Sequence, residues 1–173
     1  MKTMILITLM GCLVLFFSCC STLYPDEKLT LQRIDYQGNK LRTDGYYYFQ
    51  EPNRTSIHFL YKNGIILYAY SYPTNDLNIV EKEMINYIYL NKSKDHWGVF
   101  LVDSNVIQYE RWIEAPSGVS VCFYRCSGYI ENDSTLHFME SYYSGRNETK
   151  QIDEVWHFKQ FENKPDSTNT YIK

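Results

Sequence analysis

Charged side chains within aromatic segments are the residues of this sequence best suited to chemistry. Four of them lie among Tyr, Phe and Trp residues, namely Glu110, Arg111, Arg125 and Glu140. Alternate side chains of a strand share a face, so Glu110 lies beside Trp112, and Arg125 lies beside Phe123 and Tyr129. If these faces point into the fold, they combine an apolar wall with a few polar anchors, as ligand sites do. If they point outward, they carry solvated charges, and a register shift of one residue exchanges the two alternatives.

Cys122 and Cys126 are four residues apart in a segment that reads as a strand. That spacing separates the two residues by ~13 Å in a regular strand, whereas a disulfide needs Cα atoms ~4.4 to 6.8 Å apart. Either both thiols are free or a bulge breaks the strand between them. Metal binding is not expected, because the chain has no second cysteine pair at ligand spacing and no His-x-x-x-His.

Sequence motifs of enzymes are missing. The four histidines, His58, His96, His137 and His157, occur singly in segments that read as strands. There is no Gly-x-Ser-x-Gly, no glycine-rich phosphate loop and no His-Glu-x-x-His. We therefore predict no catalytic residue, no cofactor and a function other than catalysis.

The candidate residues must be positioned by strands, because period-two alternation dominates the chain. Eight segments show it: 41–50, 55–62, 65–72, 96–103, 106–114, 119–131, 134–143 and 151–161. Between the third and fourth, residues 75–91 carry Leu77, Val80, Met84 and Ile88 at helical spacing. Asn63-Gly64 predicts a type I′ hairpin. Short connections and eight strands predict an all-β protein, an antiparallel eight-stranded up-and-down lipocalin-like barrel with one helix at about 75–91.

Composition limits the possible partners. The 17 Tyr, 9 Phe and 3 Trp suit half-buried strands, and they also suit a ligand pocket. The formal net charge is −3, and cleavage of a leader at residue 18 would remove only one cation, Lys2. Nucleic acid is excluded as an expected partner, because binding it requires clustered Lys and Arg.

The N-terminus reads as a secretory signal, with Lys2, an apolar run over residues 4–17 and a small residue before a cysteine. The run is shorter than the ~20 apolar residues of a membrane-spanning helix. Leu15-Phe16-Phe17-Ser18-Cys19 resembles the lipobox of bacterial lipoproteins, which implies lipidation of Cys19 and anchoring to a membrane. The alternatives are lipidation of Cys20 and an ordinary cleaved signal peptide. The predicted organisation is a lipoprotein signal peptide (1–18), a tether (19–35), the barrel domain (36–162) and a flexible tail (163–173).

Five segments carry a further resemblance, to the small lipocalin-like lipoproteins of Gram-negative gut-type bacteria. They are residues 41–48 (LRTDGYYY), 59–67 (FLYKNGIIL), 97–100 (WGVF), 110–112 (ERW) and 128–134 (GYIENDS). The resemblance covers roughly residues 40–161 and implies a calycin-like barrel.

Together these observations predict a lipid-anchored protein of the cell envelope, attached to the outer membrane and facing the periplasm or the cell surface. Its barrel is expected to bind a small or extended ligand, apolar or glycan, without catalysis. The candidate ligand-binding residues are Glu110, Trp112, Phe123, Arg125 and Tyr129. The alternative is an interaction subunit of an outer-membrane protein assembly, in which the barrel core is solid.

Overall fold

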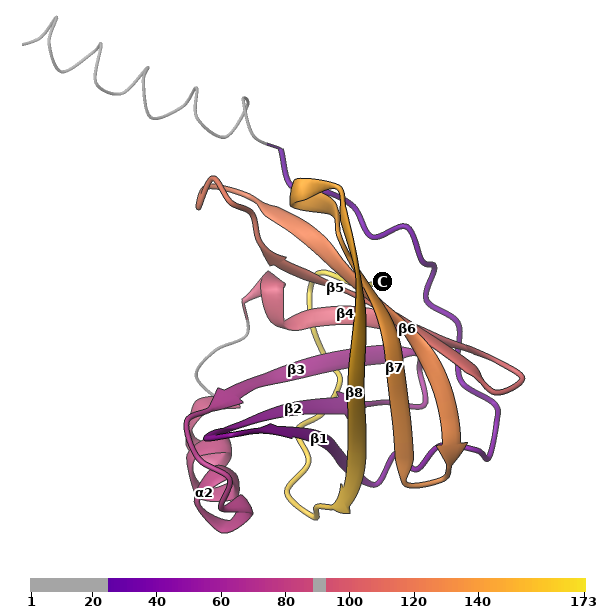
Figure 1. The fold of residues 1–173 in the computed structure, drawn as a ribbon, viewed down its shortest axis with the longest axis vertical. Coiled ribbons are helices and arrows are strands. Elements are labelled where there is room, and N and C mark those ends of the chain that lie inside the picture. The colour runs from indigo at the N-terminus through magenta and orange to yellow at the C-terminus, as the bar shows by residue number, and fades with distance from the viewer. Residues whose placement is uncertain (1–24, 89–92) are drawn as a thin grey trace, which may run out of the picture.

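The structure of the chain is a computed structural model that describes residues 25–88 and 93–173 (Figure 1). The predicted signal peptide and the lipidation site Cys19 lie outside these residues. Within them, no helix combines the length and the apolar character needed to cross a bilayer.

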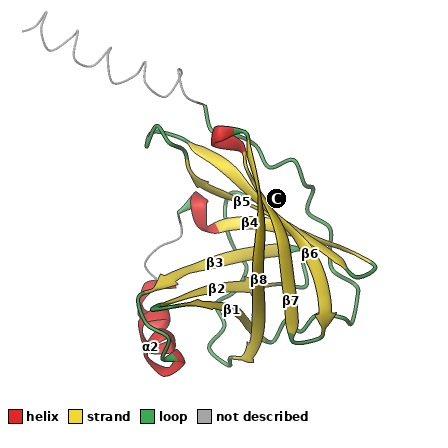
Figure 2. Ribbon diagram, viewed as in Figure 1, coloured by secondary structure: helices red, strands yellow, loops and turns green. Residues whose placement is uncertain are grey.

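Eight antiparallel strands close into an up-and-down barrel, each pairing with the next and β8 pairing with β1. The strands are β1 (Gly45–Glu51), β2 (Arg54–Leu60), β3 (Ile65–Tyr72), β4 (Trp97–Asp103), β5 (Val106–Glu114), β6 (Val121–Asn132), β7 (Thr135–Tyr143) and β8 (Glu148–Gln160). Among the described residues one α-helix is present, α2 (Leu77–Ile88), which lies between β3 and β4 at one side of the barrel (Figure 2). The predicted fold class is therefore confirmed.

The two ends of the barrel differ in their connections. We call the end with the β1–β2 hairpin, the β5–β6 loop and the β7–β8 turn the open end, and the opposite end the closed end. The β2–β3 hairpin belongs to the closed end and turns where Asn63-Gly64 predicts. Of the residues in this hairpin turn, only Gly64 takes a positive φ, 77°, and its N–H donates to the Tyr61 carbonyl at 3.0 Å. The turn is thus a type I turn followed by a left-handed glycine, not the predicted type I′.

Helix α2 is held by its first turn and by one apolar face. The backbone N–H of Asn78 donates to the Asp76 carboxylate at 2.9 Å, which caps the helix. Val80 and Met84 are fully buried against the outer surface of the barrel, in one cluster with Phe59 and Leu67. From the same helix, Glu81 accepts a hydrogen bond from the Tyr46 hydroxyl at 2.8 Å. The helix therefore covers the outside of the first strands.

The N-terminal segment also covers the outside of the barrel. Residues 25–36, here called the strap, run from the open end to the closed end (Figure 1). Backbone hydrogen bonds fix both ends of the strap, from Glu27 to the Val121 carbonyl at 2.9 Å and from Tyr36 to the Lys62 carbonyl at 2.6 Å. The described part of the predicted tether (19–35) therefore packs against the wall.

The C-terminal residues, predicted as a flexible tail (163–173), also contact the barrel. The ammonium of Lys164 donates to the carbonyls of Thr43 at 2.6 Å and Leu60 at 2.7 Å. It also lies 4.1 Å from the centre of the Tyr61 ring. Asn63 donates to the Ser167 hydroxyl at 2.8 Å, and Ile172 packs against the outer apolar cluster. Helix, strap and tail together bury much of the outer surface of the wall.

One seam of the wall is short. Strands β3 and β4 share only three paired positions, Ile65 to Leu67 with Val99 to Trp97. Further along β3, Tyr70 has a φ of 89°, which bends the strand away from regular pairing. The 3₁₀ turn η1 (Lys94–His96) lies beside this seam, and its Asp95 carbonyl accepts a hydrogen bond from Arg111 on β5.

Candidate functional site

Ring contacts between strands that are not neighbours identify the face that points into the barrel. The ring of Tyr109 on β5 lies 5.0 Å from that of His58 on β2 and 5.1 Å from that of Phe138 on β7. His58 in turn stacks on Trp156 of β8, with centroids 4.2 Å apart and planes 6° apart. In each of these contacts the two strands are not neighbours in the barrel, so the contacts cross the interior. Residues that alternate with them face outward.

The closed half of the interior is filled with side chains. Its apolar residues are 0 to 6% exposed, and they include Leu41, Leu60, Ile66, Phe100, Ile107, Ile130 and Leu136. Tyr36, at the end of the strap, packs on Phe100 at this end with ring centroids 6.1 Å apart. The barrel interior is thus packed in this half, and a hollow of about 590 Å³ at this end lies between residues 34–40 and residues 100–104.

The open half holds a cleft of about 190 Å³ between six of the eight strands. Its aromatic lining consists of Phe49, Tyr68, Tyr109, Tyr124 and Trp156. Its polar lining consists of Glu51, Ser56, His58, Arg111 and Glu154. This volume is about six times the ~30 Å³ share of a water molecule in the liquid, so the cleft suits a small ligand.

Arg111 is the cation of the cleft. Its guanidinium carbon lies 4.1 Å from the centre of the Tyr68 ring, within the range of a cation–π contact. Nη1 donates to the backbone carbonyls of Asp95 and Trp112, both at 3.3 Å. Nε is buried and has no hydrogen-bond partner. Among the described residues, Arg111 forms no ion pair with a carboxylate.

Glu154 is the buried acid of the cleft. Burial raises the pKa of its carboxyl above the ordinary value, and the nearby charge of Glu51 adds to the rise. The indole N–H of Trp156 donates to this carboxylate at 3.1 Å and partly opposes the shift. The cleft thus contains two carboxyl groups and one guanidinium, and the part of the chain that is described shows no ion pair among the three.

His58 forms the floor of the cleft as a neutral ring. Burial, with a smaller contribution from the charge of Arg111, lowers its pKa well below the ordinary value. Behind it, burial raises the pKa of the Cys126 thiol to about 12, which keeps the sulfur protonated at neutral pH. Cys122 and Cys126 are both free.

The five residues predicted to bind ligand lie on the outer face instead. Glu110 alternates with Tyr109 and Arg111, and Arg125 alternates with Tyr124. The alternative in which their faces point inward is therefore wrong. Three of the five have other surroundings: Trp112 donates to the Glu27 carbonyl at 2.8 Å, Phe123 packs on the Tyr142 ring at 5.8 Å, and Tyr129 is 55% exposed.

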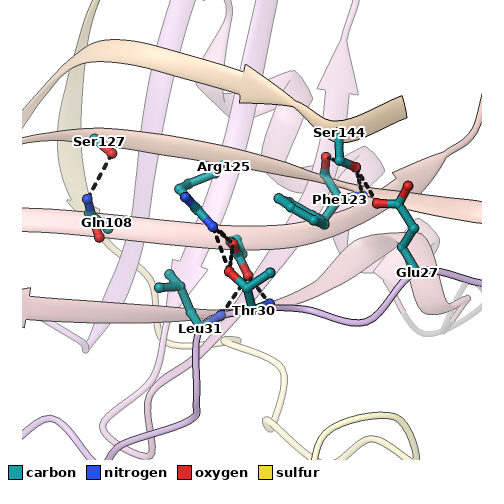
Figure 3. Close-up of polar contacts among 9 residues, drawn as sticks. Glu27, Thr30, Leu31, Gln108, Phe123, Arg125, Ser127 and Ser144 are labelled. Atoms are coloured by element: carbon teal, nitrogen blue, oxygen red, sulfur yellow. Dashed lines mark hydrogen bonds and ion pairs between the residues drawn. The ribbon is translucent and has the colours of Figure 1, made fainter. Parts of the chain in front are cut away.

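Glu110 and Arg125 are nonetheless brought together, and they fasten the strap. Figure 3 shows Arg125 beside Thr30 and Leu31 of the strap. The Glu110 carboxylate is fully buried and pairs with the Arg125 guanidinium. It also accepts backbone N–H bonds from Thr30 at 2.6 Å and Leu31 at 2.8 Å. Burial alone would raise the pKa of Glu110, but these hydrogen bonds outweigh burial and hold the pKa below its ordinary value. We call this group the strap clasp.

Sequence reasoning missed Tyr109 and Glu154, and it noted His58 only as a single histidine of a strand and Arg111 only as a charge. The signal that assigns faces is the contrast between an apolar and a polar side, and here it is weak. Ile57 and Phe59, which flank His58, are both fully buried under the outer covering of the barrel. Alternation therefore locates the strands but does not say which face is inside.

Comparisons with protein-family models, with curated proteins and with solved structures give no match for this chain.

Proposed function

We propose that this protein is a lipid-anchored protein of the cell envelope whose barrel binds a small ligand in the cleft at its open end. The observation that carries the proposal is the buried Nε of Arg111, which has no partner within a cleft of aromatic rings. Buried polar groups almost always have a hydrogen-bond partner, and leaving one without it costs ~1 to 3 kcal/mol. A ligand that accepts this hydrogen bond would remove the cost.

The dimensions of the cleft narrow the class of ligand. At about 190 Å³ it is smaller than the ~300 to 1,000 Å³ of pockets for drug-sized ligands. Half of its lining residues are polar. These properties support a small, partly polar ligand rather than an extended apolar one.

Filling the cleft tests ligand binding. Ser56→Trp places an indole in the cleft, and Ser127→Trp places the same group on the outer face of β6 as a matched control. Each serine makes one hydrogen bond with another side chain. The hydroxyls of Ser56 and Ser71 are 3.0 Å apart, and Gln108 donates to the Ser127 hydroxyl at 3.2 Å. Native mass spectrometry of protein purified from its own host should show a small bound mass that Ser56→Trp removes and Ser127→Trp retains. A bound mass retained in both variants would exclude the cleft as its site.

Anchoring rests on the sequence of the N-terminus and has its own test. Mass spectrometry of the membrane fraction should find a mature N-terminal peptide that begins at Cys19 and carries acyl chains. Cys19→Ala should release the protein from the membrane, whereas Cys20→Ala should not. An unmodified, soluble mature chain would contradict the anchor.

An interaction role is the second candidate, and the outer wall provides the observation that favours it. Val106, Tyr129 and Met139 are 40, 55 and 40% exposed on consecutive strands β5, β6 and β7. Exposed apolar groups that lie together are a feature of protein interfaces. Tyr129→Glu should then remove a partner that crosslinks in the envelope, while Ser56→Trp leaves the crosslink intact.

A further inference from the structure

We infer that the ligand of the cleft is a planar aromatic monocarboxylate, with its carboxylate on Arg111 and its ring against the aromatic lining. This inference rests on the proposed binding function and names the chemical class of the ligand. It is carried by the free edge of the guanidinium, by the aromatic floor and by the charges of the cleft.

The guanidinium of Arg111 presents one unused edge. Both of its hydrogen bonds leave from Nη1, toward the carbonyls of Asp95 and Trp112. The N–H of Nε and one N–H of Nη2 are parallel; Nε is buried without a partner, and the hydrogen bonds that the described residues accept from this side chain leave from Nη1. Two parallel N–H groups match the two oxygens of a carboxylate, which forms a bidentate pair with such an edge.

Stacking with Tyr68 fixes the orientation of this edge. The guanidinium carbon is 4.1 Å from the centre of the Tyr68 ring and 5.9 Å from that of Tyr124. A guanidinium that is stacked and tied to two carbonyls loses little further freedom when it binds an anion. The preorganised edge therefore favours recognition of one planar group over general attraction of negative charge.

The floor of the cleft suits a flat ring. His58 and Trp156 stack with only 6° between their planes, and Phe49 lies on Trp156 with centroids 5.7 Å apart. Tyr109 closes the floor with its edge toward His58, at an interplanar angle of 74°. Rings in contact at 4.5 to 7 Å contribute ~0.5 to 1.5 kcal/mol beyond their buried area. A volume of about 190 Å³ accommodates one ring with its carboxylate.

Glu51 and Glu154 decide which anion is accepted. Both line the same cleft as Arg111, so the carboxyl groups outnumber the guanidinium. Both carboxyl groups repel a bound anion, and a doubly charged phosphate meets more of this repulsion than a monoanion, while a single guanidinium attracts either of them. A carboxylate is therefore favoured over a phosphate.

Titration of the mature, full-length protein with four probes tests the inference. The probes are benzoate, 4-hydroxybenzoate, benzyl alcohol and phenyl phosphate, and the readout is the NMR shift of the Trp156 indole N–H. Both carboxylates should bind at least ~10-fold more tightly than benzyl alcohol and phenyl phosphate, because only they match the edge and the charge. This comparison uses the unaltered protein and does not depend on the folding of a variant.

A substitution then assigns the effect to Arg111. Arg111→Lys keeps the charge but loses the parallel N–H groups, and it should weaken benzoate binding at least ~10-fold. Arg146→Lys, at an exposed position in the turn η2 (Ser144–Arg146) of the same end, is the matched control and should leave binding unchanged. Thermal unfolding of both variants verifies that the barrel is intact.

Three outcomes would overturn the inference. Equal affinities for benzoate and benzyl alcohol would show that binding does not require a carboxylate, while the proposed binding function would stand. Tighter binding of phenyl phosphate would replace the carboxylate by a phosphate. No shift of Trp156 with any probe up to about 10 mM would exclude the whole class, since even weak affinities of ~1 mM would be detected. The proposed function would then still be tested separately, by native mass spectrometry of the wild type and Ser56→Trp purified from the host.

Discussion

Tyr109 and Glu110 are consecutive residues of β5, and they serve opposite sides of the barrel wall. The Tyr109 ring meets His58 across the interior at 5.0 Å, whereas the Glu110 carboxylate accepts the N–H groups of Thr30 and Leu31 from the strap. One strand thus lines the cleft with one face and holds the N-terminal segment with the other.

Loss of the Glu110 charge should loosen the strap. Glu110→Gln keeps the shape of the side chain but replaces the charged acceptor of the wild type by a neutral amide. Hydrogen bonds to a charged group contribute ~1.5 to 3 kcal/mol each, so their loss of strength destabilises the fold. We expect a loss of about 1 to 3 kcal/mol in the free energy of unfolding, together with faster hydrogen exchange at Thr30 and Leu31. Asp44→Asn is the control, since its exposed ion pair with Arg42 contributes at most ~1 kcal/mol. Unchanged exchange at Thr30 in Glu110→Gln would contradict the clasp.

The clasp should also open in acid. The pKa of Glu110 is lower in the folded protein than its ordinary value of 4.5. Its contribution to stability is therefore complete above pH ~4.5 and is lost as the pH falls through the folded pKa. Hydrogen exchange at Leu31, measured from pH 6 down to about 3, should accelerate relative to the barrel strands. Glu110→Gln should show no such change with pH.

His58 should resist protonation and make the barrel sensitive to acid. Because its pKa is lowered well below 6.5, the unfolded chain binds a proton at a higher pH than the folded protein does. The free energy of unfolding should therefore fall below pH 6.5 by up to ~1.4 kcal/mol per pH unit from this residue. His58→Phe keeps a ring against Trp156 and should remove that slope. An NMR titration of His58, with the exposed His157 as comparison in the same spectrum, measures the protonation directly.

Lys164 should give a stability change at higher pH. Burial lowers its pKa from 10.5 to about 7, so between these values the unfolded chain holds a proton that the folded protein has released. Stability from this residue thus increases as the pH rises from about 7 toward 10.5. The difference in unfolding free energy between the wild type and Lys164→Met should grow in favour of the wild type from pH 7 to 9. A difference that is constant with pH would mean that Lys164 remains charged when folded.

The two cysteines should be unreactive until the barrel opens. Cys122 and Cys126 are 2 and 0% exposed, and burial raises the pKa of Cys126 to about 12. Iodoacetamide should leave the peptide that contains them unmodified in the native protein, and should label both thiols in guanidinium without a reductant. A requirement for reductant would reveal a disulfide.

The number of strands and their approximate bounds could be predicted from the sequence, whereas their inner and outer faces could not. Predicted and observed bounds of the third and fifth strands coincide, at 65–72 and 106–114. Period two is a local property, so it survives in a single sequence. Face assignment requires one side of a strand to be polar. Residues 57–61 are all buried, whichever side of the wall they face, so this contrast is missing there.

Order in the strap and the tail was also beyond sequence reasoning, because it depends on distant partners. Thr30 meets Glu110 across 80 residues, and Lys164 meets Leu60 across 104. Both segments are polar, and a polar segment near a terminus is ordinarily loose. Only the folded barrel brings together the acceptors that hold them.

The direction of the strap sets how the barrel would stand on a bilayer. Its first hydrogen bonds, at Asp26 and Glu27, are made to Val121 at the open end. If Cys19 carries the lipid, residues 20–25 can extend by only ~20 Å between the acyl chains and that end. The mouth of the barrel would then face the lipid headgroups at short range, so a ligand would enter from the thin layer of water between protein and membrane.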